Sequence, residues 1–210
     1  MDFQEYQKQS ILTKPDLAET YGFNELGNPF KLFNKTSTMN NFNDLSYLIN
    51  SIHMSLGMCS ELSEVLKALD KANKVDISEE LADICWYVSG EFNIIKHVSD
   101  FTFTVSENND TSILNSLYNS LVYDVVEYSD IVKKELAYRK IKDKHEKVAI
   151  LHDILTDINS LANFFEIDME VALQNNIDKL QKKRYQNGFN EKDAVNRDLE
   201  GERKELEKNQ

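Results

Sequence analysis

The feature that most constrains this chain is a pair of acidic doublets on two consecutive segments with helical periodicity. The first is Glu61-x-x-Glu64, within GMCSELSEVLKAL, and the second is Glu80-x-x-Asp83, within ISEELADICWYVSGEF. Residues three apart lie on one side of a helix, about one turn from each other. Two such helices that face each other can therefore direct four carboxylates at one point. A hard divalent cation that prefers oxygen ligands, such as Mg²⁺, is the natural occupant of such a point.

The angular position of these acids separates a metal site from a solvated helix face. At about 100° per residue, Glu61 and Glu80 each fall beside the apolar stripe of their own helix rather than opposite it. A charge that only solubilises a helix belongs on the face opposite the stripe. The pattern favours Glu61, Glu64, Glu80 and Asp83 as metal ligands, and a solvated acidic face remains the alternative.

Composition predicts one domain with an all-α fold. The chain has 210 residues, of which 41% are hydrophobic, which is enough for one sizeable core over residues 1–210. It contains 2 Pro and 6 Gly, too few for a turn-rich all-β fold. Cys59 and Cys85 point away from the acids on their helices, and we expect them to be reduced thiols of the core.

Charge and hydropathy limit the partners and the location. The formal net charge of −12 disfavours a nucleic-acid backbone or an anionic membrane as the main partner. No apolar run approaches the roughly 18 residues of a membrane span. The first residues, MDFQEYQKQS, lack the apolar region of a signal peptide. These features together predict a soluble, cytoplasmic protein.

Helical periodicity and punctuation predict the order of the elements. Seven helices are expected, over residues 2–12, 44–71 with a candidate break at Gly57, a segment capped by Asp76 or Ser78 that runs to 98, 112–140, 145–166, 168–185 and 191–208. Residues 20–43 are predicted to form a loop or lid. The polar connection over 99–111 contains FTFTV, whose alternation would suit a brief strand.

The last expected helix, 191–208, differs from the others in its composition. Asn190 and Asp193 resemble an N-terminal capping arrangement for it. It is highly charged and has few apolar positions, so we expect it to be peripheral, either exposed or packed against a partner chain.

A second set of acids faintly repeats the first. Glu127-x-x-Asp130 precedes Asp153-x-x-Thr156, on the predicted helices 112–140 and 145–166. This set is incomplete, and its angular pattern is poorer. We interpret it as a decayed internal duplication that completes a helical bundle without binding a second metal, with coincidence among acidic helices as the alternative.

Three blocks of the sequence together resemble a known family. The stretch 57–92 contains SELSE, a gap and EELADICWYV, the opening helix contains FQEYQKQS, and residues 173–206 contain NNIDKLQKKRY. In these blocks the chain resembles the MazG-like nucleoside triphosphate pyrophosphohydrolases of phage and bacterial type, in the all-α NTP pyrophosphatase superfamily. It departs from compact members in the longer segments 13–50 and 99–150, which puts the substrate and the subunit arrangement in doubt more than the chemistry.

The resemblance implies a fold, a reaction and a set of site residues. The fold would be the MazG-like helical bundle, assembled as a homo-oligomer and most simply as a dimer. The reaction would be Mg²⁺-dependent hydrolysis of an NTP or dNTP to the monophosphate and pyrophosphate, with Mn²⁺ as a substitute. The same four carboxylates would hold one or two metal ions and carry catalysis, while Lys179 and Arg184, with Asn176, would bind the phosphates of the substrate.

Two aromatic side chains next to Asp83 have two interpretations each. Trp86 and Tyr87 would either bind substrate, with Trp86 stacking on the nucleobase, or pack at a helix seam or subunit contact. None of the 4 His residues stands in an E-x-x-H motif, which argues against a di-iron carboxylate bundle. His53 and His97 are interpreted as core or surface residues.

Two other functions remain open at the level of the sequence. The same metal site would serve a dUTP-type diphosphatase or an alarmone hydrolase. The chain could also be a non-catalytic helical interaction protein that keeps the acidic bundle as a scaffold. Intact carboxylates at all four positions favour an enzyme over a scaffold.

Overall fold

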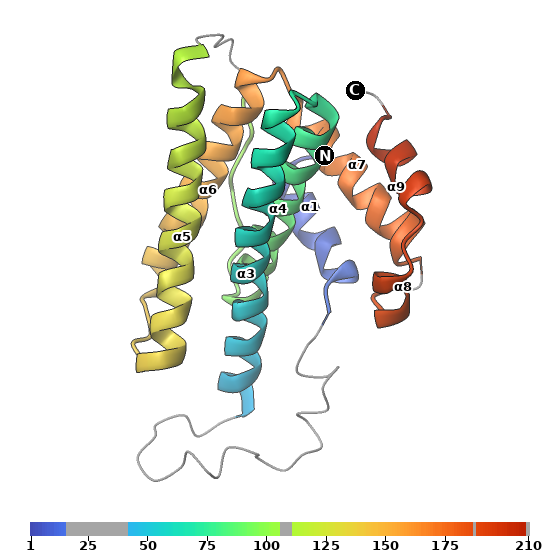
Figure 1. Cartoon of the computed structure of the whole chain (residues 1–210). Coiled ribbons are helices and arrows are strands. Elements are labelled where there is room, and N and C mark those ends of the chain that lie inside the picture. The colour runs from blue at the N-terminus through green and yellow to red at the C-terminus, as the bar shows by residue number, and fades with distance from the viewer. Residues whose placement is uncertain (16–41, 106–110, 187, 209–210) are drawn as a thin grey trace.

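The computed structural model describes residues 1–15, 42–105, 111–186 and 188–208, and these form an all-α structure, as the sequence predicts (Figure 1). Most of the predicted loop or lid over 20–43 lies outside the described residues. Among those described, no helix combines the length and the apolar character that a membrane span needs. The α-helices are α1 (Phe3–Ser10), α3 (Phe42–Asp70), α4 (Lys74–Ile94), α5 (Leu114–Tyr138), α6 (Lys144–Phe164), α7 (Met169–Asp178), α8 (Glu191–Val195) and α9 (Leu199–Leu206).

Three shorter helical turns adjoin these helices. A 3₁₀ turn, η1 (Ile11–Thr13), continues α1, and another, η3 (Thr111–Ile113), precedes α5. A π-helical turn, η4 (Lys179–Arg184), continues α7 and completes the helix predicted over 168–185. Such turns are rare and often occur at functional sites. Here the turn carries both basic residues that the sequence singles out.

Helix α4 occupies the centre of the structure. It pairs with α3 through the tight turn at 71–73, and it also contacts α1, α6 and α7. Helices α5 and α6 form a second hairpin that completes the bundle on one side, while α7, α8 and α9 lie on the other side (Figure 1). Residues of α4 therefore face different partners according to their position around the helix.

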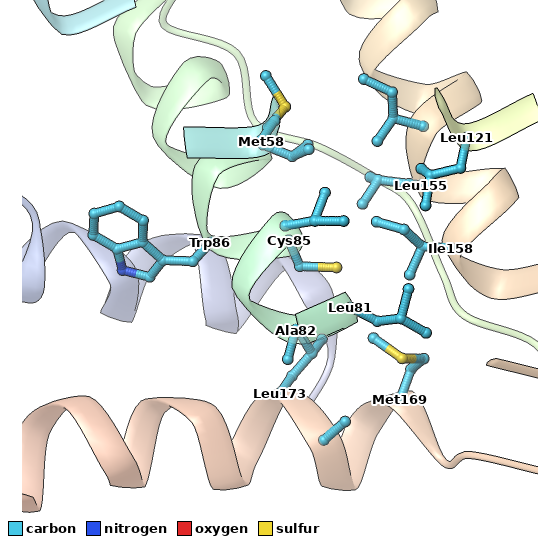
Figure 2. Packing of buried hydrophobic residues seen from close by; sticks show 14 of the residues in the cluster. Met58, Leu81, Ala82, Cys85, Trp86, Leu121, Leu155, Ile158, Met169 and Leu173 are labelled. Atoms are coloured by element: carbon cyan, nitrogen blue, oxygen red, sulfur yellow. The ribbon is translucent and has the colours of Figure 1, made fainter. Parts of the chain in front are cut away.

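The apolar core lies where α4 meets the second hairpin. Leu81 and Cys85 point from α4 toward Leu155 and Ile158 of α6, and Trp86 points away to the opposite side of the helix (Figure 2). Burial of each large apolar side chain stabilises the fold by about 1.5–3 kcal/mol. Both cysteines are free, as expected; Cys85 is buried and Cys59 is half-buried.

The expected break at Gly57 is wrong, because α3 runs through this position without interruption. Instead, the glycine allows α3 and α4 to approach each other closely. A Cβ atom at Gly57 would lie 2.0 Å from Cε1 of Tyr87 on α4. Lack of a side chain here therefore lets the ring of Tyr87 lie directly on the backbone of α3.

The limits of α4 also differ from the prediction. Its N-cap is Asn73, whose side chain accepts hydrogen bonds from the backbone N–H groups of Val75 and Asp76. Asp76, one of the predicted caps, forms an ion pair with Arg203 of α9 instead. The helix ends at Ile94 rather than near residue 98, because Lys96 takes a left-handed conformation with φ of 53°.

The FTFTV segment forms no strand. Residues 101–105 have no regular secondary structure; Phe103 contacts Phe3 of α1 and Phe101 contacts His152 of α6. The side chain of Asn159 accepts a hydrogen bond from the Thr104 N–H and donates one to the Thr104 hydroxyl. The side chain of Asn159 thus accepts the backbone hydrogen bond that a neighbouring strand would accept in a sheet.

The single helix predicted over 191–208 is two helices in the structure, α8 and α9. Asp198 interrupts the run because its side chain caps α9, accepting a hydrogen bond from the N–H of Gly201. Helix α9 packs against α7 and η4 of the same chain and buries Glu202, Glu205 and Leu206. Ion pairs of Glu202, Glu205 and Arg203 hold it there, and ion pairs leave no apolar pattern in the sequence.

Candidate metal centre

Three of the four predicted carboxylates converge. One carboxylate oxygen each from Glu61 of α3 and from Glu80 and Asp83 of α4 lie within 4.8 Å of one another. All three residues are half-buried. Within the part of the chain that the structure describes, this is the one group of three or more acidic, His or Cys side chains close enough to share a cation. Antiparallel pairing of α3 with α4 brings Glu61 of the first doublet close to both acids of the second.

Glu64 does not join the group. Its carboxylate lies 2.6 Å from the ammonium of Lys67 on the same helix, and its side chain is 45% exposed. The sequence placed Glu64 on the same side of α3 as Glu61, but about one turn further along, where a lysine is within reach. Glu64 would have to leave Lys67 and rotate to reach the other three carboxylates.

The three clustered carboxyls cannot all be ionised easily at neutral pH. Burial and the charge of Asp83 raise the pKa of Glu61 to about 7. Burial, with the charges of Asp83 and Glu79, raises the pKa of Glu80 to about 9. Protons or a cation must therefore compensate the charge of the cluster.

Lys179 supplies one compensating charge. Its ammonium lies 2.9 Å from Asp83 Oδ2 and 3.1 Å from Glu79 Oε1, and its side chain is 0% exposed. Burial alone would lower the pKa of Lys179, but the carboxylates of Asp83 and Glu79 outweigh it and raise the pKa above its ordinary value. The residue predicted to hold substrate phosphate thus holds a candidate metal ligand in this structure.

Asn176 also contacts Asp83. Its Nδ2 donates a hydrogen bond to Asp83 Oδ1 at 2.5 Å, while its Oδ1 accepts one from the hydroxyl of Tyr6 at 2.7 Å. The predicted substrate ligand is therefore placed behind Asp83, between that carboxylate and α1. Asp83 receives hydrogen bonds from both Asn176 and Lys179, which fix its orientation.

Arg184 lies near the cluster but is paired elsewhere. Its guanidinium donates two hydrogen bonds to Glu202, at 3.0 and 2.6 Å, and Arg197 donates to the same carboxylate. Burial lowers the pKa of Arg184, but the hydrogen bonds and charge of Glu202, followed by the charge of Asp83, outweigh it and raise the pKa above its ordinary value. Glu202 of α9 thus orients the arginine that the sequence assigns to phosphate.

The two aromatic candidates have different surroundings. The indole N–H of Trp86 donates to the hydroxyl of Thr13 at 2.9 Å, and the side chain is buried between α4 and η1. This position favours packing over stacking on a nucleobase. The ring of Tyr87 lies edge-on to Trp86, and its pKa is raised by burial and by the charges of Glu61 and Asp83. Tyr87 therefore borders the acidic cluster, and Trp86 supports it from behind.

The second acid set does not form a comparable group among the described residues. Asp130 is ion-paired with Lys133 and Lys134 on its own helix, and Thr156 donates its hydroxyl to the backbone of His152. Helices α5 and α6 pack on each other and against α3 and α4, so they complete the bundle.

Three residues of the site were not singled out from the sequence. Glu79 could have been found, since it lies four residues before Asp83 and so shares its helix face. Tyr6 and Glu202 gave no such signal, because each reaches the site from a helix distant in the sequence.

Comparisons of the chain with protein-family models, curated proteins and solved structures found no match.

The donor set fits a hard divalent cation. Glu61, Glu80 and Asp83 offer only carboxylate oxygens, and no thiol or imidazole takes part in the group. Mg²⁺ and Mn²⁺ favour such ligands, whereas Zn²⁺ sites usually include nitrogen or sulfur.

Proposed function

We propose that the protein hydrolyses a nucleoside triphosphate to the monophosphate and pyrophosphate with Mg²⁺ bound by Glu61, Glu80 and Asp83. One observation carries the proposal, namely that carboxylate oxygens from two adjacent helices lie within 4.8 Å of one another. The second support is the resemblance of three sequence blocks to MazG-like pyrophosphohydrolases. Cleavage between the α and β phosphorus atoms, rather than at the γ phosphorus, rests on the resemblance.

The metal would supply the electrophilic part of the chemistry, by neutralising phosphate oxygens and making a bound water more acidic. The residues of the chain hold and orient it. Asp83, held by Lys179 and Asn176, would present a fixed oxygen, while Glu61 and Glu80, whose pKa values are raised by burial, would lose their protons on binding a cation. Glu64 would join the site by exchanging Lys67 for metal, and Mn²⁺ would substitute for Mg²⁺.

The phosphates beyond the metal need positive partners. Arg184 is the best placed, because its charge interacts with that of Asp83 and because Glu202 holds its guanidinium plane. A guanidinium can bind two phosphate oxygens at once. Lys179 is less available, since it is fully buried between Asp83 and Glu79. In this proposal Lys179 acts on the metal ligand and Arg184 acts on the substrate.

A substrate panel tests the proposal. The purified protein is incubated with the common NTPs and dNTPs, including dUTP, and with a guanosine tetraphosphate, in Mg²⁺, in Mn²⁺ and in excess EDTA. Chromatography identifies the products. The proposal expects a nucleoside monophosphate and pyrophosphate, formed with either metal and not in EDTA. Rates that are unchanged in EDTA, or nucleoside diphosphate and orthophosphate as products, would contradict it.

The same panel separates the related alternatives. Hydrolysis confined to dUTP would identify a dUTP-type diphosphatase. Activity on guanosine tetraphosphate alone would identify an alarmone hydrolase. Absence of hydrolysis of every compound would leave the helical interaction protein as the better explanation.

A further inference from the structure

Tyr6 lies where three helices meet. It belongs to α1, which contacts both α4 and α7, and its side chain is 0% exposed. Its hydroxyl is 2.7 Å from Asn176 Oδ1 on α7 and 3.0 Å from the backbone oxygen of Ala82 on α4. Helix α4 carries Asp83, and α7 leads into Lys179. The phenol thus connects the first helix of the chain to both elements that position the candidate metal ligand.

The hydrogen bond from Tyr6 determines which way the Asn176 amide faces. A phenol has one proton to donate, and the nearer acceptor is the amide oxygen of Asn176. With its oxygen held by Tyr6, Asn176 presents its NH₂ group to Asp83 Oδ1. A carboxylate only accepts hydrogen bonds, so the opposite orientation would place two acceptors together. Burial raises the pKa of Tyr6 well above its ordinary value, which keeps the donor proton in place.

We propose that Tyr6 is a positioning residue for the metal centre, because it holds Asn176 in the orientation in which its amide fixes the carboxylate of Asp83. This inference rests on the proposed metal-binding function of Asp83. Hydrogen bonds one step behind a metal ligand orient it, and their loss typically weakens metal binding or activity by about 10–100-fold. Tyr6 touches neither metal nor substrate; it acts through Asn176.

The direct test is metal affinity in Tyr6→Phe, which keeps the buried ring and removes the hydroxyl. Mn²⁺ binding to the protein without nucleotide is measured by electron paramagnetic resonance. We expect Mn²⁺ to bind about 10-fold more weakly. In the hydrolysis assay, the Mg²⁺ concentration for half-maximal rate should rise by a similar factor, with little change in the rate at saturating Mg²⁺.

Tyr128→Phe is the matched control. Tyr128 is also fully buried in the bundle, and its hydroxyl also donates to a side-chain oxygen, Glu91 Oε2 at 3.0 Å. It should lose a comparable amount of thermal stability while Mn²⁺ affinity stays as in the wild type. Equal weakening of Mn²⁺ binding in both variants would overturn the inference, since a general loosening of the bundle would then explain both.

Asn176→Ala tests the route of the effect. Alone it should weaken Mn²⁺ binding at least as much as Tyr6→Phe, and in its presence Tyr6→Phe should add no further loss. Fully additive effects, or wild-type affinity of Asn176→Ala, would overturn the role of Tyr6. If Tyr6→Phe does not fold, wild-type Mn²⁺ affinity of Asn176→Ala would still overturn the role of Tyr6.

The two proposals fail in different ways. Asp83→Asn is included in the same titration. If the wild type binds no Mn²⁺, or if Asp83→Asn binds it as tightly as the wild type, the metal centre is wrong and the role of Tyr6 with it. If Asp83→Asn loses binding while Tyr6→Phe retains it in full, only the role of Tyr6 is wrong.

Discussion

Lys179 places its ammonium 3.0 and 2.9 Å from the two carboxylate oxygens of Asp83, inside the protein rather than at its surface. The lysine side chain is 0% exposed, whereas that of Asp83 is 23% exposed. A fixed positive charge therefore stands behind the carboxylate, and the front of the carboxylate remains accessible. Lys179 thus balances part of the negative charge of the cluster before any cation binds, and burial, by raising their pKa values, keeps protons on Glu61 and Glu80 to a higher pH than usual.

Replacement of Lys179 should destabilise the protein in a way that Mg²⁺ partly repairs. In Lys179→Met, Asp83 and Glu79 lose their buried partner. We expect a loss of about 3 kcal/mol in the free energy of unfolding, the low end for buried pairs because both carboxylates are partly exposed. Added Mg²⁺ should raise the melting temperature of the variant more than that of the wild type. Lys133→Met, which removes an exposed lysine paired with Asp130 on α5, is the control and should behave as the wild type. Equal Mg²⁺ responses of Lys179→Met and the wild type would contradict this account.

Alanine at Gly57 should be harmful although alanine is the better helix former. In an open helix position the exchange stabilises by about 0.5–1 kcal/mol. Here the new Cβ would lie 2.0 Å from the ring of Tyr87, so we expect a net loss of about 1–3 kcal/mol in urea unfolding. Tyr87→Leu in the same chain should recover part of the loss. A Gly57→Ala variant more stable than the wild type would show that the two helices do not meet so closely.

Glu91 should make stability depend on pH. Its carboxyl is fully buried, bonded by Ser51 and Tyr128, and burial raises its pKa to about 7, against the partly compensating charges of Lys147 and Lys14. The folded state thus holds this proton more tightly than the unfolded state, whose pKa is about 4.3. The stabilising contribution is complete below about pH 4.3 and is lost as the pH rises to about 7.

The variant Glu91→Gln isolates this contribution. Glutamine resembles the protonated acid and does not titrate, so the difference in unfolding free energy between variant and wild type should shift by an amount on the order of 3 kcal/mol between pH 4 and pH 8, in favour of the variant at high pH. Denaturant unfolding at a series of pH values measures it. Parallel pH profiles for the two proteins would show that Glu91 has an ordinary pKa.

Removal of one partner of the ion pair between Glu135 and Lys147 should lower the free energy of unfolding strongly, whereas replacement of both partners by apolar residues should lower it much less. Its atoms are 2.6 Å apart, and both side chains are almost completely buried. Glu135→Gln should lose about 3–5 kcal/mol, because Lys147 then keeps a buried charge without a counter-ion. The double variant Glu135→Leu, Lys147→Met should recover most of that loss in urea unfolding. The losses of unfolding free energy of Glu135→Leu and Lys147→Met are also measured singly. If the double variant loses as much as their sum, the hydrogen-bond network around Tyr47, rather than charge compensation, stabilises this region.

Local pattern predicted most of the helices and the convergence of four acids, of which three meet, since periodicity and the i,i+3 spacing are properties of short segments. It did not predict that Glu64 would pair with Lys67, because from its position on α3 the side chain of Glu64 could reach either the acidic cluster or Lys67. Gly57 was misread for a related reason: glycine is a helix breaker in isolation, and its use in a close approach depends on Tyr87 of another helix.

Contacts distant in the sequence were beyond such patterns. Tyr6 meets Asn176 across 170 residues, and Arg203 meets Asp76 across 127. Helix α9 was expected at the periphery because it has few apolar positions. Glu202 and Glu205 are nevertheless buried, because they form ion pairs with Lys183 and Arg184 of η4 and with Arg197, which precedes α9. Charged residues of this kind look like a solvated face until their partners are known.

We propose that the cluster of Glu61, Glu80 and Asp83 binds the metal ion with which the protein would hydrolyse a nucleoside triphosphate. Phosphorus NMR of a nucleoside triphosphate with Mg²⁺ tests it directly, with the wild type, Asp83→Asn and Glu64→Gln compared at equal concentration. We predict nucleoside monophosphate and pyrophosphate from the wild type, a rate lower by about 100-fold or more in Asp83→Asn, and a smaller loss in Glu64→Gln. Wild-type rates in Asp83→Asn, or no cleavage by the wild type, would contradict the claim.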